Sequence, residues 1–142
     1  MKLTTNSESE TIAAAHNLAT SLKPGDILCL HGNLGVGKSV FARALIHTLM
    51  NDETLEVPSP TFTLLQTYDS QIAPINHYDL YRLKDPQEIY ELGWEDSLAS
   101  SITIVEWPER LGPLTPAQRL DITLSNVKNK PDVREIEIAR IK

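Results

Sequence analysis

The glycine-rich segment GNLGVGKS, residues 32–39, constrains this chain more than any other stretch, because it matches the pattern G-x-x-x-x-G-K-[ST] in full. An apolar run at 27–30 precedes it, and large apolar residues recur every four positions in the run 40–50 that follows. This order predicts a strand, a tight loop and an amphipathic helix, the context in which the motif binds phosphate. The glycines let the backbone wrap round an anion, and the first helical turn offers it unpaired N–H groups. The segment therefore predicts a nucleotide site.

Three further side chains complete the predicted site. Within the motif, Lys38 is expected to reach the β- and γ-phosphates, and the hydroxyl of Ser39 is expected to bind Mg²⁺. The buried run 102–106 ends in Glu106, which is typical of the strand beside the first one, whose terminal acid lies near the metal. A surface glutamate at a strand end is the alternative interpretation of this residue. Trp107 follows directly and is placed to cover the nucleotide pocket.

The length and the charge of the chain limit which domain organisations and functions are possible. The 142 residues predict one domain, 1–142, with a single sizeable core. A net charge of -6 argues against direct binding of nucleic acid, which needs clustered Lys and Arg. No apolar run approaches membrane-spanning length and the first residues are polar, so we expect a cytoplasmic protein with no membrane contact. Cys29 lies in the apolar strand and is expected to be a buried, unreactive thiol.

The segment 57–62, VPSPTF, contains two prolines that force a stiff, extended path. Such a path can deliver the hydroxyls of Ser59 and Thr61 beyond the phosphate loop. It resembles the switch segment of nucleotide hydrolases, in which a threonine senses the γ-phosphate and metal. A proline-rich connector before a strand remains the alternative.

Two β-branched and aromatic runs, 61–68 and 75–83, predict a hairpin joined by residues 69–74. Alternation in the second run places His77 and Asp79 on its more apolar face. A carboxylate there is costly without a partner, so Asp79 is a candidate for the metal shell or for positioning a water. His77 is interpreted as a satisfied core histidine.

The remaining patterns predict a helix at 7–21 with a Ser7–Glu10 capping box, a helix begun at 85–88 and ended by Gly93, a helical turn at 94–99, and closing antiparallel strands at 120–124 and 135–139. The stretch 129–132 spells N-K-x-D, the guanine-reading motif of GTPases. No D-x-x-G occurs in the chain, and strands rather than a strand and a helix flank the motif. We therefore interpret it as a polar hairpin turn.

Taken together, GNLGVGKS, VPSPTF, HYDLYRL, ELGWEDSL and IVEWPE resemble, in this order and spacing, the TsaE (YjeE) family of small bacterial ATPases. The resemblance implies a three-layer α/β P-loop NTPase domain, with a mostly parallel central sheet and antiparallel hairpin extensions. It also implies an ATPase that supports N6-threonylcarbamoyladenosine modification of tRNA together with the partner proteins TsaD and TsaB. The partners are expected to hold the tRNA, and activity alone is expected to be weak.

The resemblance also implies residue roles. ATP would be bound by Asn33, Gly35, Val36, Gly37, Lys38, Ser39, Val40 and Trp107; Mg²⁺ by Ser39 and Glu106; and the catalytic set would be Asp79, Glu106 and Thr61. Asn33 and Val36 stand where Asp and Ala are usual. Val40 replaces a second hydroxyl residue, so one α-phosphate contact must come from backbone N–H alone.

Two other functions share this loop. A small-molecule kinase would need an arginine-rich lid to exclude water, but only Arg43 and Arg82 lie between Gly37 and Glu106. The other is an interaction module that binds a nucleotide but hardly hydrolyses it. The presence of Ser39, Asp79 and Glu106 together argues against this alternative.

Overall fold

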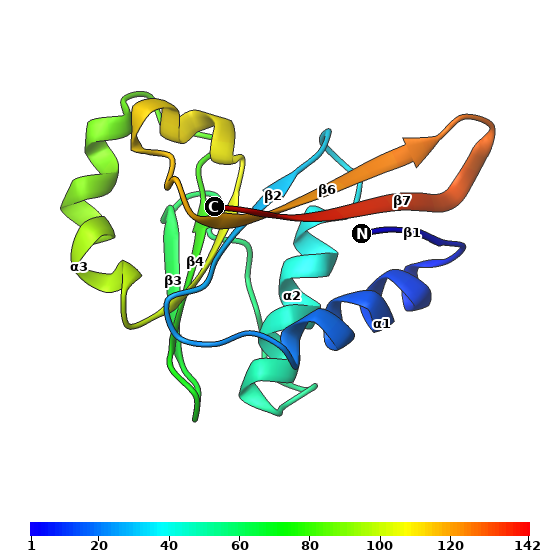
Figure 1. Cartoon of the computed structure of the whole chain (residues 1–142), viewed down its shortest axis with the longest axis horizontal. Helices are drawn as coiled ribbons and strands as arrows, with labels where there is room; N and C mark the ends of the chain where they lie inside the picture. Colours follow the sequence, from blue (N-terminus) through cyan, green and yellow to red (C-terminus); the bar gives the residue numbers. More distant parts are fainter.

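The computed structural model describes all residues, 1–142, and contains seven strands and five helical segments (Figure 1). The strands are β1 (Lys2–Thr5), β2 (Ile27–His31), β3 (Leu65–Asp69), β4 (Pro74–Asp79), β5 (Ile102–Glu106), β6 (Arg119–Val127) and β7 (Lys130–Ile141). The helices are α1 (Glu8–Ala19), α2 (Lys38–Met50) and α3 (Trp94–Leu98), with 3₁₀ segments η1 (Pro86–Leu92) and η2 (Pro108–Leu114).

All seven strands form one sheet in the order β1-β7-β6-β2-β5-β4-β3. The central strands β6, β2, β5 and β4 are parallel, whereas β7 and β1 extend one edge and β3 the other in antiparallel pairing. This confirms the predicted fold, a parallel core with antiparallel extensions. The stretch 120–124 needs a correction: it is antiparallel to β7 but parallel to β2, since hydrophobic alternation carries no information on strand direction.

The two faces of the sheet are covered differently. Helices α1 and α2 pack side by side against one face, below the sheet in Figure 1, and enclose the larger apolar core. The short segments η1, α3 and η2 cover the other face over β4 and β5, where a second apolar cluster lies. The third layer of the sandwich therefore consists of short helical turns.

Local signals set most helix ends. Ser7 caps α1 by accepting a hydrogen bond from the N–H of Glu10 (3.2 Å). The Glu10 carboxylate accepts from the N–H of Asn6 and not from that of Ser7, so the predicted capping box is shifted by one residue. The capping box of Asp85 and Glu88 forms, but it begins a 3₁₀ segment, which Gly93 ends in the left-handed region. The helical turn after it forms α3.

The hairpin of β3 and β4 forms with shorter strands than predicted. Leu64 has a positive φ, which breaks the extended path before β3. After Asp79, the N–H of Leu80 donates to the carbonyl of Glu106, and the chain leaves the ladder there. Strand β1 was not predicted, because four residues without apolar alternation carry no strand signal; its pairing with β7 forms it. None of the helices combines the length and the apolar character needed to cross a membrane.

Candidate functional site

The phosphate loop joins the end of β2 to the start of α2. Gly32 requires glycine, because a Cβ there would lie 2.7 Å from the carbonyl oxygen of Leu124 and from Cγ1 of Val36. Gly37 has φ +114° immediately before the first helical residue. This bend turns the first N–H groups of α2 toward the loop, where they can bind an anion.

Strand β7 supports the phosphate loop through a hydrogen bond. The Nε–H of Arg134 donates to the carbonyl oxygen of Val36 at 2.8 Å, and Val36 is itself buried. Asn33 and Gly35 are exposed on the loop. Arg134 was not predicted from the sequence, since 98 residues separate it from Val36 and no motif marks it.

Lys38 lies under the loop with its ammonium enclosed. Its Nζ donates to the carbonyl oxygen of Gly32 and lies 3.2 Å from the ring centroid of Trp107, a cation–π contact. Burial lowers the pKa of Lys38, and the carboxylates of Glu109, Glu106 and Asp79 partly offset this effect. Trp107 therefore covers the lysine of the site.

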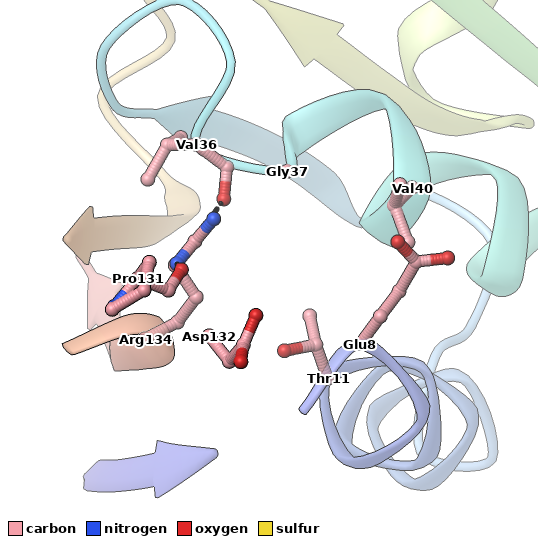
Figure 2. A pocket seen from close by; sticks show the side chains of 8 residues that line it. All are labelled: Glu8, Thr11, Val36, Gly37, Val40, Pro131, Asp132 and Arg134. Atoms are coloured by element: carbon pink, nitrogen blue, oxygen red, sulfur yellow. Dashed lines mark hydrogen bonds between the residues drawn. The ribbon is translucent and has the colours of Figure 1, made fainter. Parts of the chain in front are cut away.

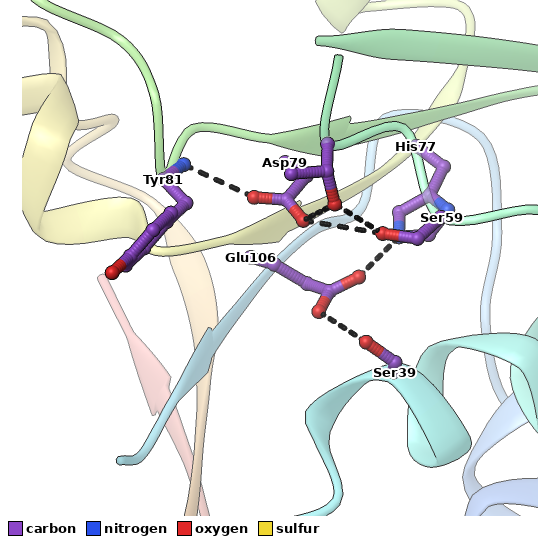
Figure 3. Close-up of polar contacts among 7 residues, drawn as sticks. Ser39, Ser59, His77, Asp79, Tyr81 and Glu106 are labelled. Carbon is purple, nitrogen blue, oxygen red and sulfur yellow. Dashed lines mark hydrogen bonds and ion pairs between the residues drawn. The ribbon is translucent and has the colours of Figure 1, made fainter. Parts of the chain in front are cut away.

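Glu106 is the centre of a hydrogen-bonded chain that crosses three elements (Figure 3). Its Oε1 accepts from the hydroxyl of Ser39 on α2 (3.1 Å), and its Oε2 contacts Nε2 of His77 on β4 (2.7 Å). Only 2% of Glu106 is exposed. Strand β5 runs parallel to β2, as predicted, and places Glu106 opposite Leu30 at the foot of the phosphate loop.

Asp79 lies one strand further from the loop, opposite Glu106 in the β4–β5 pairing. Its Oδ2 accepts from the hydroxyls of Thr61 (3.2 Å) and Ser59 (3.4 Å), which also bond to each other (2.7 Å). Its Oδ1 accepts from the N–H of Tyr81 (3.0 Å). The structure thus brings both hydroxyls of the 57–62 segment onto the acid that was selected from the sequence.

Ser39 and Glu106 fit a magnesium ion. Two oxygen donors face each other at the first turn of α2, and the chain has no cluster of three His, Cys, Asp or Glu side chains able to hold a metal alone. Mg²⁺ prefers oxygen, keeps several waters and is usually bound by one or two protein groups together with substrate phosphates. The donor set therefore suits Mg²⁺ bound with a nucleotide.

A cavity of about 120 Å³ adjoins the phosphate loop (Figure 2). It is lined by Glu8, Thr11, Val36, Gly37, Val40, Pro131, Asp132 and Arg134. Residues 129–132 lie in the β6–β7 hairpin, as the sequence predicted, and Asn129 adopts the left-handed region. The hairpin nonetheless carries Asp132 to the wall of this cavity, which chain order alone did not indicate.

The family model described as "Threonylcarbamoyl adenosine biosynthesis protein TsaE" matches residues 5–136. The chain belongs to the TsaE family. The match begins at the last residue of β1, ends within β7, and includes the phosphate loop, the Asp79 region and Glu106.

Curated TsaE relatives support this assignment. The tRNA threonylcarbamoyladenosine biosynthesis protein TsaE of Rickettsia conorii is 46% identical over 126 residues, covering 89% of this chain and 71% of the relative. TsaE of Bacillus subtilis is 34% identical over 142 residues, covering 99% of this chain and 86% of the relative. The crystal structure of Bacillus subtilis YdiB superposes with a TM-score of 0.79 at 28% identity, over 100% of this chain and 86% of that one.

Proposed function

We propose that this TsaE-family chain binds and hydrolyses ATP with Mg²⁺, and so supports N6-threonylcarbamoyladenosine modification of tRNA. The observation that carries the ATPase part is the convergence of Lys38, Ser39 and Glu106 at one phosphate loop. The names of the relatives support the tRNA pathway.

The residues divide the work of phosphoryl transfer between them. Lys38 and the N–H groups of the loop would hold the β- and γ-phosphates, and Ser39 with Glu106 would hold Mg²⁺, which supplies positive charge to the transferring group. Asp79 would orient the attacking water. In the structure its Oδ2 is occupied by Thr61 and Ser59, so one hydroxyl must turn away before a water is ordered there. Thr61 would thereby link the γ-phosphate to the acid.

The base is proposed to enter the cavity beside the loop. Cavities of about 150 Å³ hold a benzene ring in other proteins, so the observed volume accepts part of a purine. The Asp132 carboxylate can accept from an exocyclic amine on such a ring. We expect ATP to outcompete GTP, and Asp132→Ala to weaken ATP binding. If GTP bound more tightly than ATP, and Asp132→Ala abolished that preference, the result would instead favour a GTPase.

The partners are proposed to be TsaD and TsaB. Large apolar side chains are exposed around the site: Leu34 on the loop (75%), Phe62 beside Thr61 (80%) and Tyr81 beside Trp107 (44%). Apolar side chains grouped on a surface commonly mark protein contacts. These three exposed side chains, the rim of the site, support the proposal of a partner that docks beside the site and on which hydrolysis would depend.

Phosphate release tests the proposal. We expect slow release from ATP by the chain alone, faster release with TsaD, TsaB and tRNA, and none from Lys38→Ala, which lacks the charged phosphate contact. Lys23→Ala is the matched control, because Lys23 is an exposed lysine before β2, at the end opposite the loop. Unchanged release by Lys38→Ala would overturn the site assignment.

A further inference from the structure

We propose that His77 is a positioning residue for Glu106, which fixes one carboxylate oxygen so that the other faces Ser39 and the metal. The proposal rests on the magnesium role of Glu106 given above. It reverses the sequence interpretation, in which His77 was a satisfied core histidine.

The contact is short and shielded from water. His77 lies on β4 and Glu106 at the end of β5; both are 2% exposed, and Nε2 is 2.7 Å from Oε2 (Figure 3). Since a carboxylate has lone pairs but no proton to give, Nε2 carries the hydrogen and donates it. The contact therefore selects one tautomer of the ring.

The other ring nitrogen shows that this contact is the ring's sole polar role. Nδ1 is buried and has no hydrogen-bond partner. Buried polar atoms are normally paired, so the unpaired Nδ1 leaves the bond to Glu106 as the one hydrogen bond of the ring. The imidazole of His77 thus hydrogen-bonds to Glu106 alone, although burial of Nδ1 without a partner costs free energy.

The two oxygens of Glu106 consequently differ. Oε2 is held by His77, whereas Oε1 accepts only the hydroxyl of Ser39, a bond that the hydroxyl can give up. Without His77, nothing holds Oε2, so the buried carboxylate can rotate and Oε1 no longer keeps its position facing Ser39. Residues that orient metal ligands in this way typically change metal affinity by about 10- to 100-fold when replaced.

The test compares His77→Leu with His77→Gln by titrating Mg²⁺ at fixed nucleotide and following nucleotide binding. We expect His77→Leu to raise the Mg²⁺ concentration for half-maximal binding by about 10- to 100-fold. Metal-free nucleotide binding should stay unchanged, because Lys38 and the loop are intact. His77→Gln should restore most of the Mg²⁺ response, since its amide N–H replaces the Nε2 donor.

Asn76→Leu is the matched control, a buried polar residue on the same strand but the opposite face; it should leave the Mg²⁺ requirement unchanged. An unchanged requirement in His77→Leu, or no recovery in His77→Gln, would overturn the positioning role.

Nitrogen-15 NMR of the metal-free protein adds an independent readout, which should show His77 protonated at Nε2; protonation at Nδ1 alone would also overturn it. If the unmodified chain bound no nucleotide with Mg²⁺, the proposed function would fail instead, while the NMR result would still judge the His77–Glu106 contact.

Discussion

At the scale of single residues, the site contains two acids whose neighbours differ. Glu106 contacts Ser39 directly, so Glu106→Ala should weaken Mg²⁺-dependent nucleotide binding as well as hydrolysis. Asp79 contacts Thr61 and Ser59 instead. Asp79→Ala should therefore keep Mg·ATP binding but slow hydrolysis by on the order of 10²-fold, the scale of a positioned acid or base.

Nucleotide titrations at fixed Mg²⁺, together with single-turnover hydrolysis, separate these two outcomes. The matched control is Asp132→Ala, an acid in the cavity proposed for the base, which should affect binding without regard to Mg²⁺. Loss of binding in Asp79→Ala with binding retained in Glu106→Ala would show that the two roles are reversed.

Cys29 makes a pH prediction at the same scale. Burial, followed by the nearby Asp121 carboxylate, raises the pKa of its thiol from 9.0 to about 12, while Arg119 opposes this shift. The thiol holds its proton to a higher pH in the folded chain than in the unfolded chain. Its contribution to the free energy of unfolding is therefore fully present below pH 9 and is lost as the pH rises toward 12. The free energy of unfolding, measured in denaturant, should be lower by roughly 1 kcal/mol at about pH 10. Cys29→Ala should not show this decrease. Equal pH profiles for the two proteins would contradict the shift.

At the scale of elements, the β6–β7 hairpin supports the phosphate loop. Arg134→Ala removes the bond to the Val36 carbonyl and leaves that carbonyl without its charged donor. A hydrogen bond to a charged group stabilises the folded loop by about 1.5–3 kcal/mol, so its loss should disorder the loop and weaken nucleotide binding, by at most about 100-fold. Arg140→Ala is the control from the same strand, since its half-exposed guanidinium lies 3.8 Å from Asp26, away from the loop. Equal nucleotide affinity of both variants would show that the hairpin does not brace the loop.

At the scale of the whole molecule, the exposed rim and the site should be separable. Phe62→Ala should leave ATP binding by the isolated chain intact but weaken binding to the proposed partner pair, TsaD–TsaB, by roughly 10-fold or more, the scale of an aromatic interface residue. Ile72→Ala is the control, because Ile72 is also exposed (52%) but lies in the β3–β4 turn, at the far end of the hairpin from Asp79. Calorimetric titration of each variant with the partner pair measures this. Equal losses in both variants would place the partner elsewhere.

The sequence by itself determined the parts of this protein that depend on local chemistry. The phosphate motif, the apolar strand before it and the helix after it predicted β2, the loop and α2, because each signal acts within a few residues. The run ending in Glu106 was predicted to lie beside β2, and it does. The resemblance to the TsaE family added the fold class, and the family model confirms the membership.

Only the tertiary structure decided which distant groups meet. Sequence patterns record period and polarity, whereas strand order, direction and register depend on packing over the whole sheet. For this reason Arg134 and Asp132 were not expected beside the loop, and His77 was not connected to Glu106. A strand period places two side chains on one face, but it does not say which side chain of the neighbouring strand each of them contacts; the β4–β5 register decides that.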